Sequence, residues 1–136
     1  MSQPDGPSDP ERPIAIDAMG GDRAPSVVIE GAVEACRAGA GPLILVGDQA
    51  RIKAELEHFD LDGLPIGVEH APESIAMSDS PSRAARSKRE SSMHRCFELL
   101  KSGEACATVS AGNSGAFLAV GLLSVRRLEG CDRPAI

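Results

Sequence analysis

The sequence predicts an α/β fold built on a mostly parallel β-sheet. Short apolar runs rich in β-branched residues alternate along the chain with longer runs whose apolar residues recur at helical spacing. Strands that alternate with helices in this way form parallel sheets with right-handed crossover connections. The 136 residues are enough for the hydrophobic core of one domain.

The first half of the chain alternates strand, helix, strand and helix. Strands are expected at residues 14–19, 43–47 and 66–69, where the sequence is apolar and bounded by glycine or polar residues. The first helix is expected to begin at Pro25 and to end at Gly39 or Gly41. Its predicted apolar face comprises Val28, Ala32, Val33 and Cys36. Asp48 is expected to cap the second helix, whose apolar stripe comprises Ile52, Leu56 and Phe59.

The second half begins with a polar connection over residues 71–82, a length that is often functional in α/β units. Residues 83–101 are predicted to be helical with a break near Ser91 and Ser92, and Gly103 closes that helix. A buried strand at 106–109, a turn at 110–115 and an apolar helix at 116–125 follow.

The two ends of the chain differ in character. Residues 1–12 contain three prolines among small polar residues, which predicts a disordered tail. Residues 133–136 resemble the lead-in to a further strand, and the helix at 116–125 is apolar nearly all round, so it needs partners on several sides. We therefore expect residues 13–136 to be the amino-terminal part of a larger α/β protein.

Composition argues against several classes of protein. A net charge of −6, with three Phe and no Trp or Tyr, disfavours nucleic-acid binding. The widely spaced cysteines (Cys36, Cys96, Cys106 and Cys131) indicate small core residues in a reducing compartment. Because no signal core or membrane-length apolar stretch occurs, a cytoplasmic location is expected. No spacing supports a metal site, and His58, His70 and His94 are predicted to be surface residues.

The turn at residues 110–115 is the strongest candidate for a binding site. It joins a buried strand to a helix and contains hydroxyl, amide and glycine residues, so that free backbone N–H groups at the helix start favour an anion. The alternative is that Asn113 or Ser114 only caps the helix.

A second glycine corner, residues 17–22 (Asp-Ala-Met-Gly-Gly-Asp), follows the first strand, and Gly47 and Asp48 follow the second. In a parallel sheet these turns share one edge with residues 110–115, and they are expected to line one crevice. Neither a phosphate-binding P-loop nor a dinucleotide fingerprint is present.

Residues 83–101 hold six Lys or Arg against two Glu in an otherwise acidic chain. One interpretation is an ordinary solvated helix face. The other is an electropositive rim that steers an acidic partner or an anionic substrate to the crevice. Both interpretations remain open at this point.

Four blocks in this order and spacing resemble those of bacterial phosphate acyltransferases, the acyl-carrier-protein:phosphate transacylases of phospholipid synthesis. Residues 17–22 are similar to the family's Asp-x-Met-Gly-Gly-Asp opening, and residues 86–99 to its second block. Residues 110–116 and 133–136 are similar to the third and fourth. The resemblance covers roughly residues 13–136; Ser114 replaces a usual Thr, His94-Arg95 replaces an Arg-aliphatic pair, and family members are more than twice as long.

The resemblance implies transfer of a fatty acyl group from acyl carrier protein to inorganic phosphate, without a cofactor or metal. It implies a three-layer fold like isopropylmalate dehydrogenase and phosphotransacetylase, incomplete in this chain. It also implies a homodimer loosely attached to the inner face of the membrane. A nicotinamide-dependent dehydrogenase of related fold and a non-catalytic phosphate-binding module are the alternatives.

On this reading the site residues divide into three groups. The catalytic candidates are Asp17, Asp22 and Asn113. The candidates for binding substrate or phosphate are Gly20, Gly21, Ser110, Gly112, Asn113, Ser114 and Gly115. The candidates for contact with the carrier protein are Arg86, Lys88 and Arg89. All depend on the convergence of the two glycine corners in the folded chain.

Overall fold

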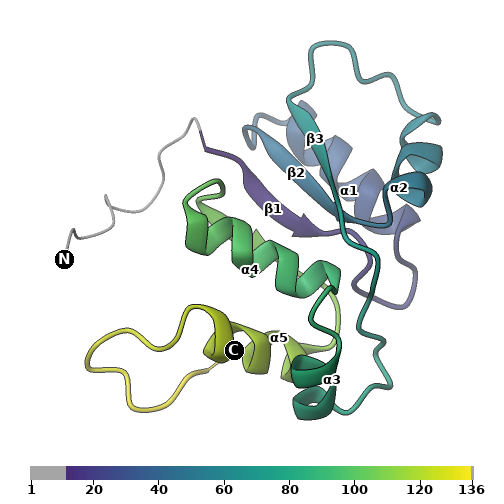
Figure 1. Ribbon diagram of the computed structural model, residues 1–136. Helices are drawn as coiled ribbons and strands as arrows, with labels where there is room; N and C mark the ends of the chain where they lie inside the picture. The colour runs from purple at the N-terminus through teal and green to yellow at the C-terminus, as the bar shows by residue number, and fades with distance from the viewer. Residues whose placement is uncertain (1–11, 136) are drawn as a thin grey trace.

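A computed structural model describes residues 12–135, so the predicted tail lies almost wholly outside the described residues. Four parallel strands form one sheet in the order β3-β2-β1-β4 (Figure 1). Their bounds are Ile14–Asp17 for β1, Leu43–Gly47 for β2, Ile66–His70 for β3 and Ala107–Val109 for β4. The register pairs Ile14 with Leu43 on one side and with Ala107 on the other. The predicted parallel α/β architecture is confirmed.

Five helices connect and follow the strands. Their bounds are Ser26–Arg37 for α1, Gln49–Leu56 for α2, Pro81–Ser87 for α3, Ser92–Ser102 for α4 and Ser114–Ser124 for α5. The predicted helix at 83–101 is thus two helices, with the break falling just before Ser92 as the paired serines indicated. Asp48 caps α2 by accepting the Arg51 N–H at 3.1 Å, as expected. Gly103 ends α4 with a φ of 81°.

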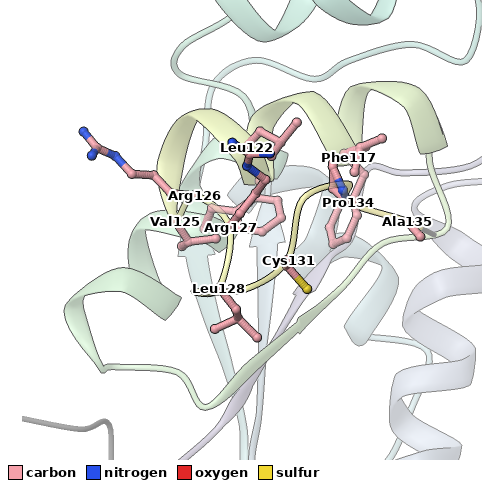
Figure 2. Close-up of a pocket in the computed structure, with 12 residues that line it drawn as sticks. Phe117, Leu122, Val125, Arg126, Arg127, Leu128, Cys131, Pro134 and Ala135 are labelled. Carbon is pink, nitrogen blue, oxygen red and sulfur yellow. The ribbon is translucent and has the colours of Figure 1, made fainter.

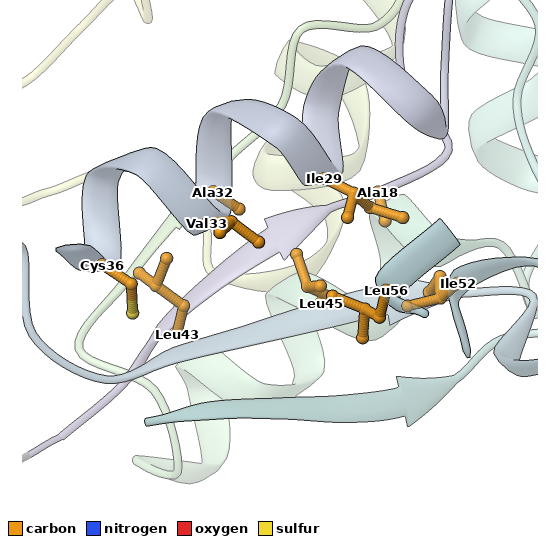
Figure 3. Close-up of a cluster of buried hydrophobic side chains, with 9 residues drawn as sticks. All are labelled: Ala18, Ile29, Ala32, Val33, Cys36, Leu43, Leu45, Ile52 and Leu56. Atoms are coloured by element: carbon orange, nitrogen blue, oxygen red, sulfur yellow. The ribbon is translucent and has the colours of Figure 1, made fainter. Parts of the chain in front are cut away.

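One face of the sheet is covered by α1 and α2 (Figure 3). Leu43 and Leu45 project from β2 into this cluster, where they meet Val33 and other residues of the two helices. The predicted apolar face of α1 needs one correction: Ile29 is fully buried, whereas Val28 is only partly buried. A stripe of Ile29, Ala32, Val33 and Cys36 keeps the spacing of a single helical face.

The opposite face of the sheet is covered by α4. Alternation along β2 turns Val46 to this side, where it packs with Cys96 and Leu99 of α4. Farther from the sheet, α4 packs against α3 and α5, with the Phe97 and Phe117 ring centroids 4.9 Å apart. The result is helix, sheet and helix in three layers, with α3 and α5 outside α4 (Figure 1).

The region after α4 is less covered. In α5 only Ala116 and Val120 of eleven residues are buried, although this helix is apolar nearly all round. Residues 131–135 are exposed and form no strand themselves, and the expectation that residues 133–136 lead into a further strand stays a prediction. Cys131 is exposed and Cys106 half-buried, against the prediction of core cysteines, because both belong to this less covered region. Within residues 12–135, no helix has the length and apolarity needed to cross a membrane.

An apolar hollow of about 330 Å³ opens between α5 and the segment that follows it (Figure 2). Its lining includes Phe117, Leu122 and Leu128, the last of which is 81% exposed. The hollow lies toward the carboxyl end of α5, away from the glycine corners at the helix's amino end.

Candidate functional site

The strand order reverses between β1 and β4. From β1 the chain proceeds outward through β2 to β3 and then returns to place β4 on the other side of β1. In open parallel sheets, ligands bind outside the carboxyl ends of the strands at such a switch point. The corner at residues 17–22 follows β1 and the corner at residues 110–115 follows β4, so the two corners flank the switch point. They will be called the first and second corners.

Asp17 occupies the end of β1 and is buried, with 2% of its surface exposed. Its Oδ1 accepts hydrogen bonds from the Ser92 hydroxyl at 2.6 Å and from the Met19 N–H at 3.2 Å. Its Oδ2 accepts the Ser110 hydroxyl at 2.8 Å. A buried carboxylate is tolerated when its oxygens are hydrogen-bonded in this way. Asp17 therefore joins the first corner, the second corner and the start of α4.

The two corners are in direct contact. A Cβ on Gly20 would lie 2.7 Å from Asp17 Oδ2 and 2.9 Å from the Gly112 nitrogen. A Cβ on Gly112 would lie 3.1 Å from Gly20 Cα. The Ser110 hydroxyl also accepts the Gly112 N–H at 3.1 Å. A side chain at Gly20 would force neighbouring atoms to move, and one at Gly112 would be tightly packed, so the backbones of the two corners lie directly against each other.

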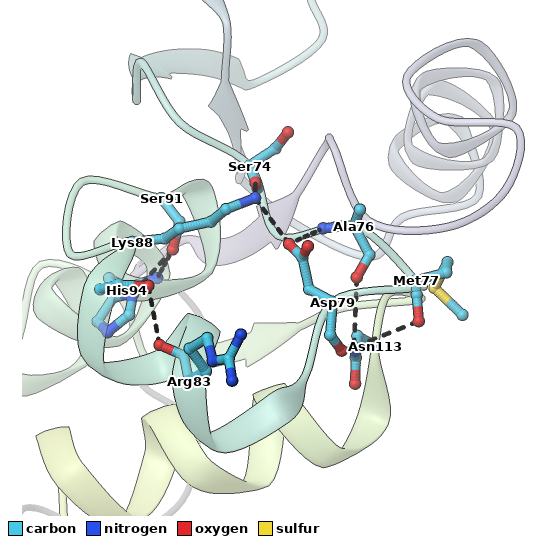
Figure 4. A network of polar contacts seen from close by, with 10 residues as sticks. Ser74, Ala76, Met77, Asp79, Arg83, Lys88, Ser91, His94 and Asn113 are labelled. Atoms are coloured by element: carbon cyan, nitrogen blue, oxygen red, sulfur yellow. Dashed lines mark hydrogen bonds and ion pairs between the residues drawn. The ribbon is translucent and has the colours of Figure 1, made fainter.

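Asn113 caps α5 and ties it to the connection before α3. Its Oδ1 accepts the Ala116 N–H at 3.1 Å, and its Nδ2 donates to the Asp79 carbonyl at 2.9 Å and the Ala76 carbonyl at 3.2 Å (Figure 4). The side chain is 7% exposed. The amide therefore uses both its donor and its acceptor within the protein, and it orders the polar connection beside the second corner.

Comparison with known sequences shows the family of this chain. Residues 13–136 match the family model described as "Fatty acid synthesis protein". The chain belongs to this fatty acid synthesis family. It is 53% identical over 123 residues to the phosphate acyltransferase of Trichlorobacter lovleyi, and 54% identical over 123 residues to that of Pelobacter propionicus. The phosphate acyltransferase of Geobacter sulfurreducens is 51% identical. Each match covers 90% of this chain and 36% of the relative.

The resemblance to phosphate acyltransferases seen in the sequence is confirmed by these matches. This chain spans a little over a third of the length of these curated relatives. The described part is the three-layer α/β segment that carries both glycine corners.

The remaining residues predicted for the two corners are more accessible. Asp22 is exposed at the end of the first corner, and Ser114 is exposed in the first turn of α5. Gly21 has a φ of 113°, and a Cβ on it would lie 3.3 Å from the Ala111 carbonyl oxygen. Gly115 packs on α3, since a Cβ there would lie 2.9 Å from Pro81 Cγ. The first-turn N–H groups of α5 at Ser114 and Gly115 have no intrahelical carbonyl to bond.

The basic residues predicted to meet a carrier protein have different surroundings. Lys88 is an internal contact: its Nζ lies 2.7 Å from Asp79 Oδ2 and 3.1 Å from the Ser74 carbonyl oxygen (Figure 4). Its hydrogen bond, helped by the Ala76 N–H, lowers the pKa of Asp79 below its ordinary value. Arg86 and Arg89 are exposed, although Arg89 Nε donates to the Arg86 carbonyl at 3.3 Å.

Two interactions were not predicted from the sequence. Ser92 binds Asp17, although the sequence marked this serine only by the break in the helix and by its place in the block at residues 86–99. His94, predicted to be a surface residue, is 5% exposed. Its Nε2 lies 2.9 Å from the Ala85 carbonyl and its Nδ1 lies 2.8 Å from Ser91 Oγ, so Nε2 carries the proton and Nδ1 accepts the hydroxyl. The prediction that His94 is a surface residue was wrong because the break between α3 and α4 places Ser91 and the Ala85 carbonyl where the buried imidazole can bond both.

Burial decides the chemistry of these unpredicted groups. Desolvation lowers the pKa of His94 from 6.5, which keeps the imidazole neutral. Ser91 is completely buried, so its pairing with His94 orients α3 and α4 and offers no accessible nucleophile. Burial, with the charge of Asp17 in second place, raises the pKa of Cys96 to about 12. That thiol stays protonated at neutral pH.

Among the described residues, no three His, Cys, Asp or Glu form a group able to hold a metal ion.

Proposed function

We propose that this chain forms the phosphate-binding part of a phosphate acyltransferase, which transfers a fatty acyl group from acyl carrier protein to inorganic phosphate in phospholipid synthesis. The observation that carries the proposal is the contact between the two glycine corners at the switch point of the sheet. The relatives are named phosphate acyltransferases, and the acyl carrier protein and the fatty acyl group are what the family resemblance implies. The proposal extends to a cytoplasmic homodimer loosely attached to the inner membrane face, as the family resemblance implies.

In the proposed reaction a phosphate oxygen attacks the thioester carbonyl carbon. The new C–O bond gives the acyl phosphate, the C–S bond breaks, and the carrier leaves as a thiol after the sulfur takes up a proton. No nucleophile from the protein is required, so the site has to hold the phosphate in line with the carbonyl and stabilise the developing oxyanion.

The second corner is proposed to hold the phosphate. The N–H groups of Ser114 and Gly115 and the positive end of the α5 dipole favour an anion, and the exposed Ser114 hydroxyl adds a donor. Asn113 keeps this turn in place through its cap. Gly112 and Ser110 set the path of the backbone leading into the turn.

The first corner is proposed to approach the thioester. Gly20 and Gly21 leave the backbone free of side chains. Asp17 is a positioning residue in this scheme, because both its oxygens are already bound to neighbouring groups. Asp22 is exposed, and we assign it the handling of the proton from phosphate.

A chimera tests the proposal. Residues 13–135 of this chain replace the matching segment of the Trichlorobacter lovleyi relative, and acyl phosphate formation is followed against phosphate concentration. Ser114→Ala is expected to raise the KM for phosphate about tenfold, because a donor to a dianion is lost. Ser124→Ala, at the other end of the same helix, is the matched control.

The outcomes separate the candidate functions. An unchanged KM in Ser114→Ala removes the second corner from the phosphate site. A folded chimera that binds phosphate and makes no acyl phosphate favours the non-catalytic phosphate-binding module instead.

A further inference from the structure

We propose that the outer surface of α3 is a second phosphate-binding site, separate from the second corner, in which Arg83 and Arg86 hold a phosphate group. The choice of ligand rests on the proposed function. The site is a groove of about 420 Å³, which will be called the α3 groove. It is lined by Ser80, Ser82, Arg83, Arg86 and Ser87.

The lining has the donors that a phosphate group needs and lacks a competing carboxylate. Arg83 and Arg86 are three residues apart, which places them on one face of the helix. Two like charges at this spacing repel each other, and a bound anion relieves the repulsion. Three serine hydroxyls lie around them, of which that of Ser87 already donates to the Arg83 carbonyl at 2.8 Å, and α3 itself has no acidic residue.

Two of the neighbouring basic residues, Lys88 and Arg95, are neutralised within the protein, whereas these two arginines and Arg89 are not. Lys88 is paired with Asp79, and Arg95 is paired with Glu69 at 2.6 Å and with Glu98 at 2.9 Å. Over residues 12–135, neither Arg83 nor Arg86 enters an ion pair, and both are exposed. Unpaired positive charge in this segment is therefore carried by Arg83 and Arg86 at the α3 groove and by the exposed Arg89 beside it, and Lys88 is withdrawn from it.

The inner side of α3 is firmly held. Ala84 and Ala85 are buried against α4 and α5, and the Ala85 carbonyl accepts the His94 imidazole at 2.9 Å. The opposite side of the helix, which carries the arginines, is therefore presented outward on a supported backbone. The burial of Ala84 and Ala85 on one side, with both arginines on the solvent side, explains why this short helix forms although it carries two positive charges one turn apart.

The α3 groove adjoins the second corner. Pro81, next to the lining residue Ser80, packs on Gly115 in the first turn of α5. Asn113 binds the carbonyl of Asp79, immediately before Ser80 (Figure 4).

A phosphate group fits these donors better than a carboxylate. The arginine guanidinium offers a planar fork of N–H groups that matches phosphate oxygens, and the Ser80 and Ser82 hydroxyls can donate to the remaining ones. The proposed reaction supplies two sources of such a group. One is inorganic phosphate, and the other is the phosphodiester of the pantetheine arm that carries the acyl chain.

Binding to the 136-residue chain tests the groove. The probes are inorganic phosphate, 4′-phosphopantetheine and pantetheine without phosphate, each titrated by calorimetry at two salt concentrations. The double variant Arg83→Gln/Arg86→Gln is expected to weaken binding of a phosphate-bearing probe about tenfold and to reduce its salt dependence. Arg83→Lys/Arg86→Lys is expected to restore part of the affinity, since charge returns without the planar fork.

The control removes the same charge elsewhere. Arg37→Gln/Lys101→Gln lies at the carboxyl ends of α1 and α4, at the opposite edge of the sheet. This control variant is expected to leave the affinity for the phosphate-bearing probe unchanged. An equal loss of affinity in both double variants would show that binding depends on the net charge of the protein, and it would refute the α3 groove as a site. Unchanged affinity in Arg83→Gln/Arg86→Gln, with the fold checked by circular dichroism, would also overturn it. Tighter binding of 4′-phosphopantetheine than of inorganic phosphate identifies the carrier arm as the source, and the reverse identifies free phosphate.

The same variants in the chimera separate this inference from the proposed function. An active chimera whose KM values for phosphate and for acyl carrier protein both survive Arg83→Gln/Arg86→Gln refutes the groove and leaves the acyltransferase in place. A folded chimera without activity, in which arginine-dependent phosphate binding persists, refutes the acyltransferase and leaves the groove.

Discussion

The β1–β2–β3 side of the molecule and the β4–α5 side differ in how completely they are covered. On the first side, Leu45 and Val33 are fully buried between the sheet and two helices. On the second side, Val109 of β4 is 53% exposed and Leu123 of α5 is 50% exposed, although α5 is the more apolar helix. Burial is therefore decided by the partners available to an element, and composition alone does not provide them.

The candidate site lies at the junction of these two regions. Asp17 at the end of β1 reaches Ser110 after β4, and Gly20 touches Gly112. The well-packed side therefore positions the less covered side through a small number of polar and backbone contacts. Four experiments test this division, and they are given from the largest expected effect to the smallest.

Leucine truncation on the two sides is expected to give the sharpest contrast. Leu45→Ala should lower the free energy of unfolding by about 3–5 kcal/mol, because it opens a cavity in a fully buried cluster. Leu123→Ala should change it by no more than about 0.5 kcal/mol, because the side chain is half exposed. Urea denaturation of both variants measures the difference. Equal losses would show that α5 is as well covered as β2.

Removal of the junction carboxylate is expected to come next. Asp17→Ala should lower the free energy of unfolding by about 2–4 kcal/mol, since the hydroxyls of Ser92 and Ser110 lose their buried acceptor. The matched control is Asp22→Ala in the exposed part of the same corner, which should leave stability nearly unchanged. Denaturant unfolding decides the matter, and a harmless Asp17→Ala would mean that the junction does not depend on this carboxylate.

Replacement by alanine is expected to have opposite effects on stability at a glycine in the contact between the corners and at a glycine on an open helix surface. Gly20→Ala should cost about 1–3 kcal/mol, because its Cβ would lie within 3 Å of three atoms. Gly31→Ala, in α1 with nothing within 4 Å of its Cβ, should stabilise the protein by about 0.5–1 kcal/mol. Thermal unfolding compares them. A neutral Gly20→Ala would indicate that the corners separate readily.

Acidification is expected to produce the smallest effect, through His94. Its pKa is lowered in the folded state, so the unfolded chain takes up the proton first and stability falls as the pH drops below about 6.5. The loss should be about 1 kcal/mol or less between about pH 7 and pH 5.5. Comparison of His94→Gln with the exposed control His58→Gln isolates it: the first variant should show a flatter stability profile over this range. An unchanged slope would mean that the buried imidazole does not titrate on unfolding.

Much of the fold was predictable because it depends on local patterns. The strands of the well-packed side were predicted within two residues, since apolar runs bounded by glycine leave few alternatives. The cap at Asp48 and the helix end at Gly103 were correct for the same local reason. Val28 was misplaced in favour of Ile29, because adjacent apolar residues satisfy the helical period equally well until the helix is docked.

The candidate site was only partly predictable. The sequence placed the first and second corners at one edge of a parallel sheet, because strand ends align there. It did not reveal that Ser92 completes the shell of Asp17, nor that Lys88 is held by Asp79 while Arg83 and Arg86 are left unpaired. Those contacts join residues from different elements, and spacing along the chain carries no information about them.

The sequence by itself determined the alternation of strands and helices, the glycines at the corners and the family to which the chain belongs, since each resides in short stretches of neighbouring residues. Only the tertiary structure decided which apolar surfaces are covered, which charges are paired and that Gly20 lies against Gly112. The physical reason is that burial and pairing depend on the order of strands in the sheet, which brings residues more than ninety positions apart into contact.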